Sequence, residues 1–343
     1  MLRTSPLILV AVCCAAFAVG VACSEDEDAD PTATPGAAST SAASPTTIPL
    51  VNAATICASG ATPTAVEVAS PDLLEASGLA ASRTQEGVIW AHNDSGDVAR
   101  VFAMNDKGET LAAYELQGAT AIDWEDMAVG PGPDDGTGYL YLGDIGDNAA
   151  QREAVQVYRA PEPTIDPASS LLVIGEVEQL VLQYSDGAHD AETLLVDPIT
   201  GDLFIVTKEL ATGLSGVYRA PARELVDGQN VTMERVAEVD FYALRTQKEI
   251  PPGSPPLANV IHVPTGGDIS PDGSVVVLRT YATVWVWDRF PSAPLAEAFA
   301  ETPCEGPSEI EPQGEAIAFG AAGTSYYTVS EGEHPPLYRF GFD

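Results

Sequence analysis

Residues 190–209, DAETLLVDPITGDLFIVTKE, contain two short apolar runs that are joined by the turn DPITG. Asp190 and Glu192 precede the first run, and Lys208 and Glu209 follow the second. Two strands joined by a short turn form a hairpin, and the outer ends of a hairpin lie on the same side of a sheet. The stretch therefore predicts a hairpin with charged groups gathered at one end.

The same pattern recurs at residues 77–94, 123–144, 267–279 and 314–331. A third apolar segment follows each hairpin, and two of these segments read VYRAP, at residues 157–161 and 217–221. Repeats of this kind are typical of β-propellers with four-stranded blades. We predict an all-β propeller in which five repeats are detected and the two long intervals leave room for a sixth. Contact between the N-terminal and C-terminal blades would close it. The repeats are aligned on Ser77, Glu125, Glu192, Gly267 and Glu315.

The N-terminal residues predict export. Residues 1–22 combine a basic start with an apolar run that is too short to span a membrane, as in a secretory signal peptide. The run ends in GVAC and resembles the lipobox of bacterial lipoproteins, which would make Cys23 the lipidated residue; plain secretion is the alternative. Residues 23–50 are rich in Ser, Thr, Ala and Pro and predict a disordered acidic tether. Residues 51–343 would form the propeller domain.

Cysteine usage agrees with export. After removal of the signal peptide and lipidation of Cys23, Cys57 and Cys304 remain in the predicted domain. One pair of cysteines in an exported protein is most simply a disulfide. Cys57 precedes the first repeat and Cys304 precedes the last, so this bond would hold the ring of blades closed.

The charge balance limits the partners. The chain has 15 basic and 50 acidic residues, for a formal net charge of −35. Binding to nucleic acid requires a basic surface, so we expect no nucleic-acid partner. A strongly acidic surface serves either solubility or the binding of multivalent cations.

Acidic residues are concentrated at equivalent hairpin ends. Carboxylates that converge repel one another, which raises their pKa values or requires a cation. We therefore predict a Ca²⁺-binding face, against the alternative of a ring of structural hydrogen bonds at the strand ends. The predicted metal ligands are Asp94, Asp97, Glu125, Asp144, Asp147, Asp190, Glu192, Glu209 and Glu315.

Two loops on this face contain the sequence D-x-G-D, at residues 94–97 and 144–147. A glycine allows the tight bend that would turn both aspartates of a loop toward one ion, although Asp and Asn also form ordinary turns. The histidines lie in separate loops without the spacing of a transition-metal site. Of these loop residues, His92, Asn93 and His189 are the expected contacts to a ligand.

Residues 190–209 are similar to the strand pair of β-propeller phytases and related phytase-like propellers, and ISPDG at 269–273 resembles the repeat of TolB-type propellers. The resemblance implies that Asp190, Glu192, Glu209 and Glu315 are calcium ligands. It also implies that Lys208 and Arg279 bind phosphate. Phytases place several basic residues around the phosphate, whereas this chain offers two in these positions.

Two hypotheses follow. The first is a propeller in the cell envelope, lipid-anchored or secreted, that binds Ca²⁺ together with a small polar ligand or an envelope protein. The second is a metal-dependent phosphoesterase in which metal-bound water attacks the substrate, with Lys208, Arg279 and Glu192 as candidate catalytic residues. The small number of basic residues favours binding. We expect a monomer that touches the membrane only through its lipid anchor.

Overall fold

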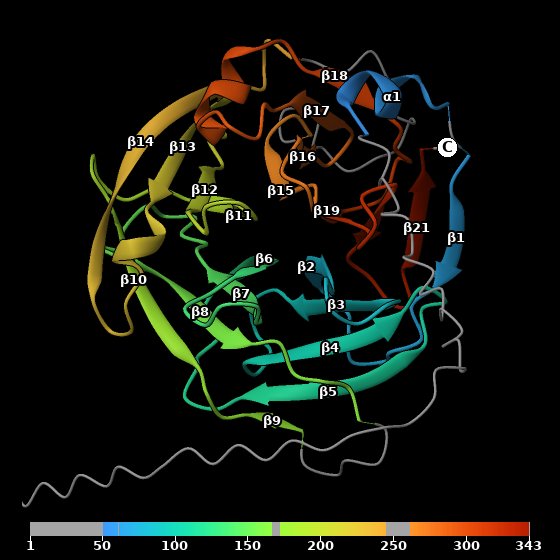
Figure 1. Ribbon diagram of the computed structural model, residues 1–343, viewed down its shortest axis with the longest axis horizontal. Helices are drawn as coiled ribbons and strands as arrows, with labels where there is room; N and C mark the ends of the chain where they lie inside the picture. The colour runs from blue at the N-terminus through green and yellow to red at the C-terminus, as the bar shows by residue number, and fades with distance from the viewer. Residues whose placement is uncertain (1–50, 61, 167–171, 245–260, 343) are drawn as a thin grey trace, which may run out of the picture. The chain divides into compact units, whose positions relative to one another are not determined.

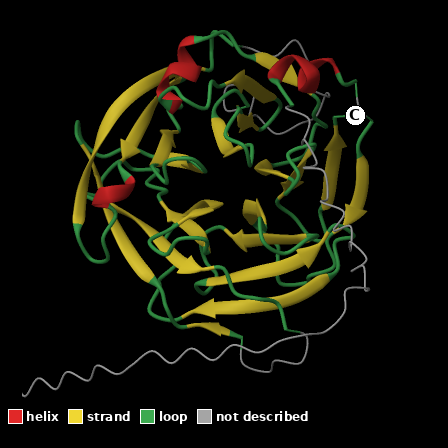
Figure 2. Cartoon of the chain, in the orientation of Figure 1, coloured by secondary structure: helices red, strands yellow, loops and turns green. Residues whose placement is uncertain are grey.

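The computed structural model describes residues 51–60, 62–166, 172–244 and 261–342. Strands dominate these residues (Figure 2), which confirms the all-β prediction. The expected signal peptide, Cys23 and tether lie outside the described residues. No helix in the described part of the chain has the length and apolar character needed to cross a membrane. The helices within the described ranges are α1 (Ala53–Ala58) and two short 3₁₀ helices, η1 (Ala222–Glu224) and η2 (Leu295–Ala300).

The first two predicted repeats form antiparallel sheets. The sheet of the first repeat is extended at its outer edge by a parallel strand from a later part of the chain. Its order is β2 (Ala76–Ala81), β3 (Val88–Asn93), β4 (Arg100–Asn105), β5 (Thr110–Leu116) and β9 (Val173–Ile174). The second repeat contributes β6 (Trp124–Pro131), β7 (Gly138–Asp144), β8 (Val155–Pro161) and β10 (Glu178–Tyr184).

The third repeat contributes β11 (Ala191–Val196), β12 (Leu203–Thr207), β13 (Leu214–Ala220) and β14 (Asn230–Asp240). Parallel pairing of β14 with β10 joins the second and third groups into an eight-stranded sheet. The VYRAP segments fall on β8 and at the end of β13, as the repeat pattern predicts. β10 and β14 are the fourth strands of the second and third repeats.

The last two repeats form separate four-stranded sheets. One contains β15 (Pro264–Ile269), β16 (Val275–Thr280), β17 (Val284–Asp288) and β18 (Cys304–Gly306). The other contains β19 (Gly314–Phe319), β20 (Ser325–Ser330), β21 (Pro336–Gly341) and the N-terminal strand β1 (Thr64–Glu67). Antiparallel pairing of β1 with β21 ties the start of the described chain to its end.

The first strands of the repeats pack against one another in cyclic order. β2 lies beside β6, β6 beside β11, β11 beside β15, β15 beside β19, and β19 beside β2. These strands lie around the middle of the sheets in Figure 1. Each buried apolar cluster is shared by two consecutive sheets, and one cluster joins the first sheet to the last through residues such as Leu79 and Val329. The core therefore lies between sheets that stand face to face.

Two buried aspartates link the first strands of different repeats. Asp126 on β6 accepts hydrogen bonds from the backbone N–H of Leu194 (3.0 Å) and Gly267 (3.2 Å), on β11 and β15. Asp268 on β15 accepts one from Phe319 N on β19 (2.7 Å). Burial raises the pKa of Asp126 well above its ordinary value, since the charged form is poorly solvated there. These carboxylates act as cross-links inside the ring of first strands.

The predicted disulfide is confirmed. Cys57 and Cys304 are bonded, with their Cα atoms 6.1 Å apart. The bond attaches α1 to β18 in the fourth repeat, while β1 completes the sheet of the fifth. It closes a loop with a sequence separation of 247, for which the chain-entropy model gives about 5 kcal/mol of stabilisation. The N-terminal segment is thus fixed to two successive sheets.

Candidate functional site

Each first strand carries a β-bulge near its start, where the pairing with the second strand shifts by one residue. A bulge leaves one residue unpaired and re-aims its side chain. The residues at the shift are Ser77, Glu125, Glu192, Thr265 and Glu315. Three glutamates thus occupy equivalent backbone positions. The sequence alignment needs one correction, because the fourth equivalent position is Thr265 and not Gly267.

The two hydroxyl residues at these positions support their neighbours. Ser77 Oγ donates a hydrogen bond to the backbone carbonyl of Glu125. Thr265 Oγ1 lies 3.1 Å from the carbonyl oxygen of Glu315 and 3.0 Å from that of Gly314. A hydroxyl at one bulge therefore fixes the backbone of the glutamate at the next bulge in the ring.

Three carboxylates from two repeats converge beside β6. Asp94 follows β3, Asp123 precedes β6, and Glu125 is the bulge residue of β6; an oxygen atom from each lies within 4.8 Å of the other two. Glu125 is 5% exposed, while Asp94 and Asp123 are half-buried. Gly146 packs against them so closely that a Cβ atom there would come within 2.3 Å of Glu125 Oε1. The absence of a side chain at residue 146 keeps the carboxylates together.

A second group lies around Lys208, which follows β12. Its ammonium group bonds Glu192 and lies 3.2 Å from the hydroxyl of Tyr281. Lys208 and Glu192 side chains are 9% and 7% exposed. Burial alone would lower the pKa of Lys208, but Glu192 and Tyr281 raise it, so the ammonium group stays charged. Glu315 is nearby and its Oε2 atom is buried without a hydrogen-bond partner among the described residues.

We call these carboxylates the acidic cluster; its members are Asp94, Asp123, Glu125, Asp190, Glu192, Glu315 and Glu331. The ionisation of each member influences, or is influenced by, that of at least one other member. Burial and then Asp94 and Asp190 raise the pKa of Asp123 to about 6. Burial raises the pKa of Glu315 and of Glu331 to about 7, and in Glu331 the charge of Asp94 adds to the rise. The cluster therefore carries more negative charge than its surroundings balance.

Glu125 shows the same imbalance most strongly. Burial is the largest cause of its raised pKa, and the charges of Glu192, Asp94 and Asp123 raise it further. Lys208 opposes this rise only in part. A carboxyl group in this position either takes up a proton or requires a cation.

Several predicted ligands form hydrogen bonds within or beside their own loop instead. Asn93 donates to Asp97 (2.6 Å) and accepts from the backbone N–H of Leu74 and Glu75. Asp97 also accepts from Arg100 at 2.8 Å. Their polar atoms are thus bonded within or beside the loop, which gives no support to the expected contacts of Asn93 with a ligand and of Asp97 with an ion.

The second D-x-G-D loop behaves in the same way. Asp144 accepts from Arg152 at 2.9 Å, and Asp147 accepts from the backbone N–H of Gln151 and Arg152. Both aspartates of this loop thus accept from Arg152, one from its side chain and one from its backbone N–H, which gives no support to their expected convergence on one ion. The loop still touches the acidic cluster, because Asp147 N donates to Asp190 at 2.8 Å.

Two other expected ligand contacts are enclosed. His92 is fully buried, with Nδ1 2.8 Å from the carbonyl oxygen of Asn93 and its ring against Trp124. Burial lowers the pKa of His92 to about 4, so the ring is neutral. Arg279 is 3% exposed and donates to Glu311 at 2.6 Å. Both side chains are enclosed in this structure, which gives no support to the ligand contact expected of His92 or to the phosphate-binding role expected of Arg279.

Arg279 lies two residues before the strand-end position that contributes to the site in the other repeats. In β3, β12 and β20 the residue that follows the strand, Asp94, Lys208 or Glu331, belongs to the site. The equivalent residue after β16 is Tyr281, which the sequence analysis missed. Arg279 lies two residues earlier and extends between β16 and β19, where it also donates to the carbonyl of Ala316 at 2.8 Å.

His189 and Glu209 bond each other, with 3.0 Å between Nδ1 and Oε1. Glu209 is thus directed to this histidine and not to the acidic cluster as predicted.

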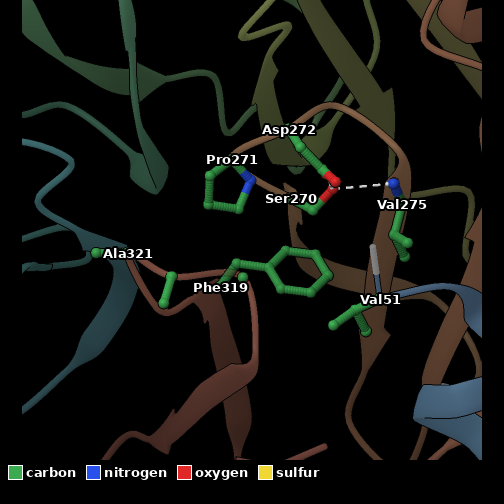
Figure 3. A pocket seen from close by; sticks show the side chains of 9 residues that line it. Val51, Ser270, Pro271, Asp272, Val275, Phe319 and Ala321 are labelled. Carbon is green, nitrogen blue, oxygen red and sulfur yellow. Dashed lines mark hydrogen bonds between the residues drawn. The ribbon is translucent and has the colours of Figure 1, made fainter. Parts of the chain in front are cut away.

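A separate cavity of about 160 Å³ lies between the turn after β15 and the end of β19 (Figure 3). Its walls are mainly apolar, and Ser270 in it accepts from Val275 N at 2.9 Å within its own turn. We assign no ligand to this cavity.

Comparison with known proteins gives no further guide: no protein-family model matches the chain, and no curated protein matches it. The interpretation of the site therefore rests on its own geometry.

Proposed function

We propose that the sheets are the blades of a five-bladed β-propeller, and that Asp94, Asp123 and Glu125 bind a divalent cation at one end of the ring of first strands. The cyclic contacts of the first strands and the clusters between consecutive sheets support the propeller. Completion of the last sheet by β1 supports it as well, because pairing of the two chain ends closes such a ring.

The convergence of Asp94, Asp123 and Glu125 within 4.8 Å is the observation that carries the proposed cation site. Ligands lie 2.3–2.6 Å from Ca²⁺ and 2.0–2.1 Å from Mg²⁺. Oxygen atoms around one ion are thus at most about 5 Å apart for Ca²⁺ and about 4 Å apart for Mg²⁺. The three oxygens lie within the limit for Ca²⁺, and a donor set made only of oxygen suits calcium.

The arrangement favours a binding protein over a phosphoesterase. Arg279 is enclosed by Glu311 and backbone carbonyls, and Lys208 is bonded to Glu192. Neither candidate phosphate-binding group is therefore free in the way that a phosphate substrate requires. A small polar ligand or an envelope protein would instead meet the bound ion at the end of the ring, beside Lys208 and Tyr281.

Calorimetric titration with CaCl₂ at fixed ionic strength tests the site. We expect saturable binding that E125Q and D123N weaken at least tenfold, because each variant removes a charged ligand. The exposed turn residues Glu86 and Asp106 supply matched controls, E86Q and D106N. Equal calcium affinity in E125Q, D123N and the unchanged protein would exclude this site.

We further propose that the propeller is exported and anchored through Cys23. The lipobox-like sequence and the Cys57–Cys304 disulfide support this location, since disulfides persist in oxidising compartments. Labelling of bacterial cells that express the full chain with radioactive palmitate tests it. We expect label in the membrane fraction that C23A abolishes; equal labelling of C23A would refute the anchor.

A further inference from the structure

Beside the acidic cluster, three polar atoms of different chemistry form a compact triangle. His189 Nε2 lies 3.1 Å from Asp186 Oδ1 and 3.0 Å from the Tyr218 hydroxyl, which is 2.9 Å from Asp186 Oδ1. Asp186 and His189 come from the loop between β10 and β11, and Tyr218 comes from β13. The triangle therefore joins the second and third repeats.

The dimensions of the triangle match the coordination of a transition-metal ion. Zinc lies about 2.0–2.2 Å from nitrogen and oxygen ligands. Two ligands at about 2.1 Å are therefore about 3.0 Å apart at a right angle and about 3.4 Å apart at a tetrahedral angle. The sides of the triangle, 2.9 to 3.1 Å, lie at the short end of this range. Only small shifts would be needed to admit an ion.

When His189 is neutral, the three atoms of the triangle face one another with too few hydrogen-bond donors. His189 Nδ1 faces a carboxylate oxygen of Glu209, which accepts only, so Nδ1 carries the ring proton. His189 Nε2 then presents a lone pair toward Asp186, which also accepts. Tyr218 has one hydroxyl proton, and it cannot be donated to Asp186 and to His189 Nε2 at the same time. A cation bound to all three atoms, above the plane of the triangle, would satisfy them.

The surroundings fix the histidine in a ligating orientation. A metal-binding histidine usually donates its second N–H to a carboxylate, which is the role Glu209 has here. The ring of Tyr184 stands edge-on to both His189, at 5.1 Å, and Tyr218, at 4.8 Å between centroids. Tyr218 is 1% exposed, whereas the Asp186 side chain is 43% exposed. An ion could therefore enter from the side of Asp186 and keep a water ligand there.

We propose that Asp186, His189 and Tyr218 form a second metal site, selective for a first-row transition-metal dication such as Zn²⁺. Imidazole nitrogen favours such ions over calcium. Binding forms bonds from the ion to Asp186 Oδ1, His189 Nε2 and Tyr218 Oη, and the phenol releases its proton to solvent.

Titration of the calcium-loaded full-length domain with ZnCl₂ tests the site. We expect one zinc ion that excess Ca²⁺ does not displace, with proton release detected from the dependence of the binding heat on the buffer. H189Q and D186N should abolish this binding event, and Y218F should weaken it at least tenfold and remove the proton release. E209Q should weaken it about tenfold, as expected for a carboxylate that only orients the histidine.

Y184F is the matched control, because it keeps the ring beside His189 and removes a hydroxyl that lies outside the triangle. It should bind zinc as the unchanged protein does. Zinc binding that H189Q and Y218F leave intact would overturn the proposal, as would a complete lack of binding. In the second case, a histidine resonance in NMR that is doubly protonated and lost in H189Q would identify the triangle as an ion pair of imidazolium with two carboxylates.

Discussion

The two halves of the acidic cluster differ in how their negative charge is balanced. Glu192 is bonded to Lys208, so one half contains a cation of its own. Among the described residues, the side chains of Asp123 and Glu125 receive no hydrogen bond from a lysine or arginine. Buried carboxylates without a partner take up protons or bind ions. The half of the acidic cluster without a lysine, which contains Asp123 and Glu125, is therefore the one suited to bind an external cation.

The largest expected effect comes from removing the internal cation. K208M should lower the free energy of unfolding by about 3–5 kcal/mol in chelator at pH 7.5, because Glu192 would remain buried without its partner. Urea denaturation measures this change. K107M, at an exposed turn residue, should stay within about 0.5 kcal/mol of the unchanged protein.

The double variant K208M/E192Q sharpens the same comparison. It removes both members of the pair, so it should regain most of the stability that K208M loses. A K208M protein as stable as the unchanged one would mean that Lys208 does not balance this half of the cluster.

The next-largest expected effect is stabilisation by calcium, which should depend on the half of the acidic cluster that contains Glu125. At a hundredfold excess over its dissociation constant, Ca²⁺ should add about 2.7 kcal/mol to the free energy of unfolding. E125Q should lose this gain, yet it should be at least as stable as the unchanged protein in chelator, because it removes a buried charge near Asp94 and Asp123. Thermal unfolding in calcium and in chelator at equal ionic strength measures both. A fall in the stability of E125Q in chelator would contradict the idea of excess charge.

Much of the fold could be predicted from the sequence because the same hairpin pattern recurs along the chain. The hairpins, the third strands at VYRAP and the disulfide all appear where the pattern places them. The alignment failed in the fourth repeat, where Thr265 and not Gly267 is the bulge residue. Glycine and aspartate at 267–268 resemble the start of the other repeats, and only the strand pairing reveals the offset.

The site was harder to predict than the fold. Acidic residues at strand ends identified Glu125, Glu192 and Glu315, since equivalent positions converge in a ring. The pattern could not distinguish Asp94, which faces the cluster, from Asp97, which pairs with Arg100 three residues later. Such choices depend on the path of a loop backbone and on which partner happens to be nearest, and neither is encoded in residue type.

A smaller effect should appear in the pH dependence. Glu315 and Glu331 have pKa values of about 7 in the folded protein, above the ordinary value of 4.5. Between these values the folded state holds more protons than the unfolded state, so stability decreases as pH rises. Allowing for solvent screening and mutual coupling, we expect a loss of about 1–2 kcal/mol from pH 5 to pH 8 in chelator.

Saturating calcium should reduce this pH dependence, because the ion replaces protons in balancing the cluster. Urea denaturation across the pH range, with and without calcium, measures the difference. A stability in chelator that rises from pH 5 to pH 8 would show that other groups dominate and that the cluster is balanced without ions.

The smallest expected effect concerns the bulge positions that carry hydroxyl groups. S77A removes the hydrogen bond to the carbonyl of Glu125 and should cost about 1 kcal/mol, the usual net value for such a bond. It should leave the calcium dissociation constant unchanged, since the Glu125 carboxylate itself is intact and Gly146 still confines it. Urea denaturation and calorimetry on the same preparation measure the two quantities. A tenfold loss of calcium affinity in S77A would mean that Ser77 holds Glu125 in its ligating position, and the hydroxyl bulges would then belong to the cation site rather than only to the frame around it.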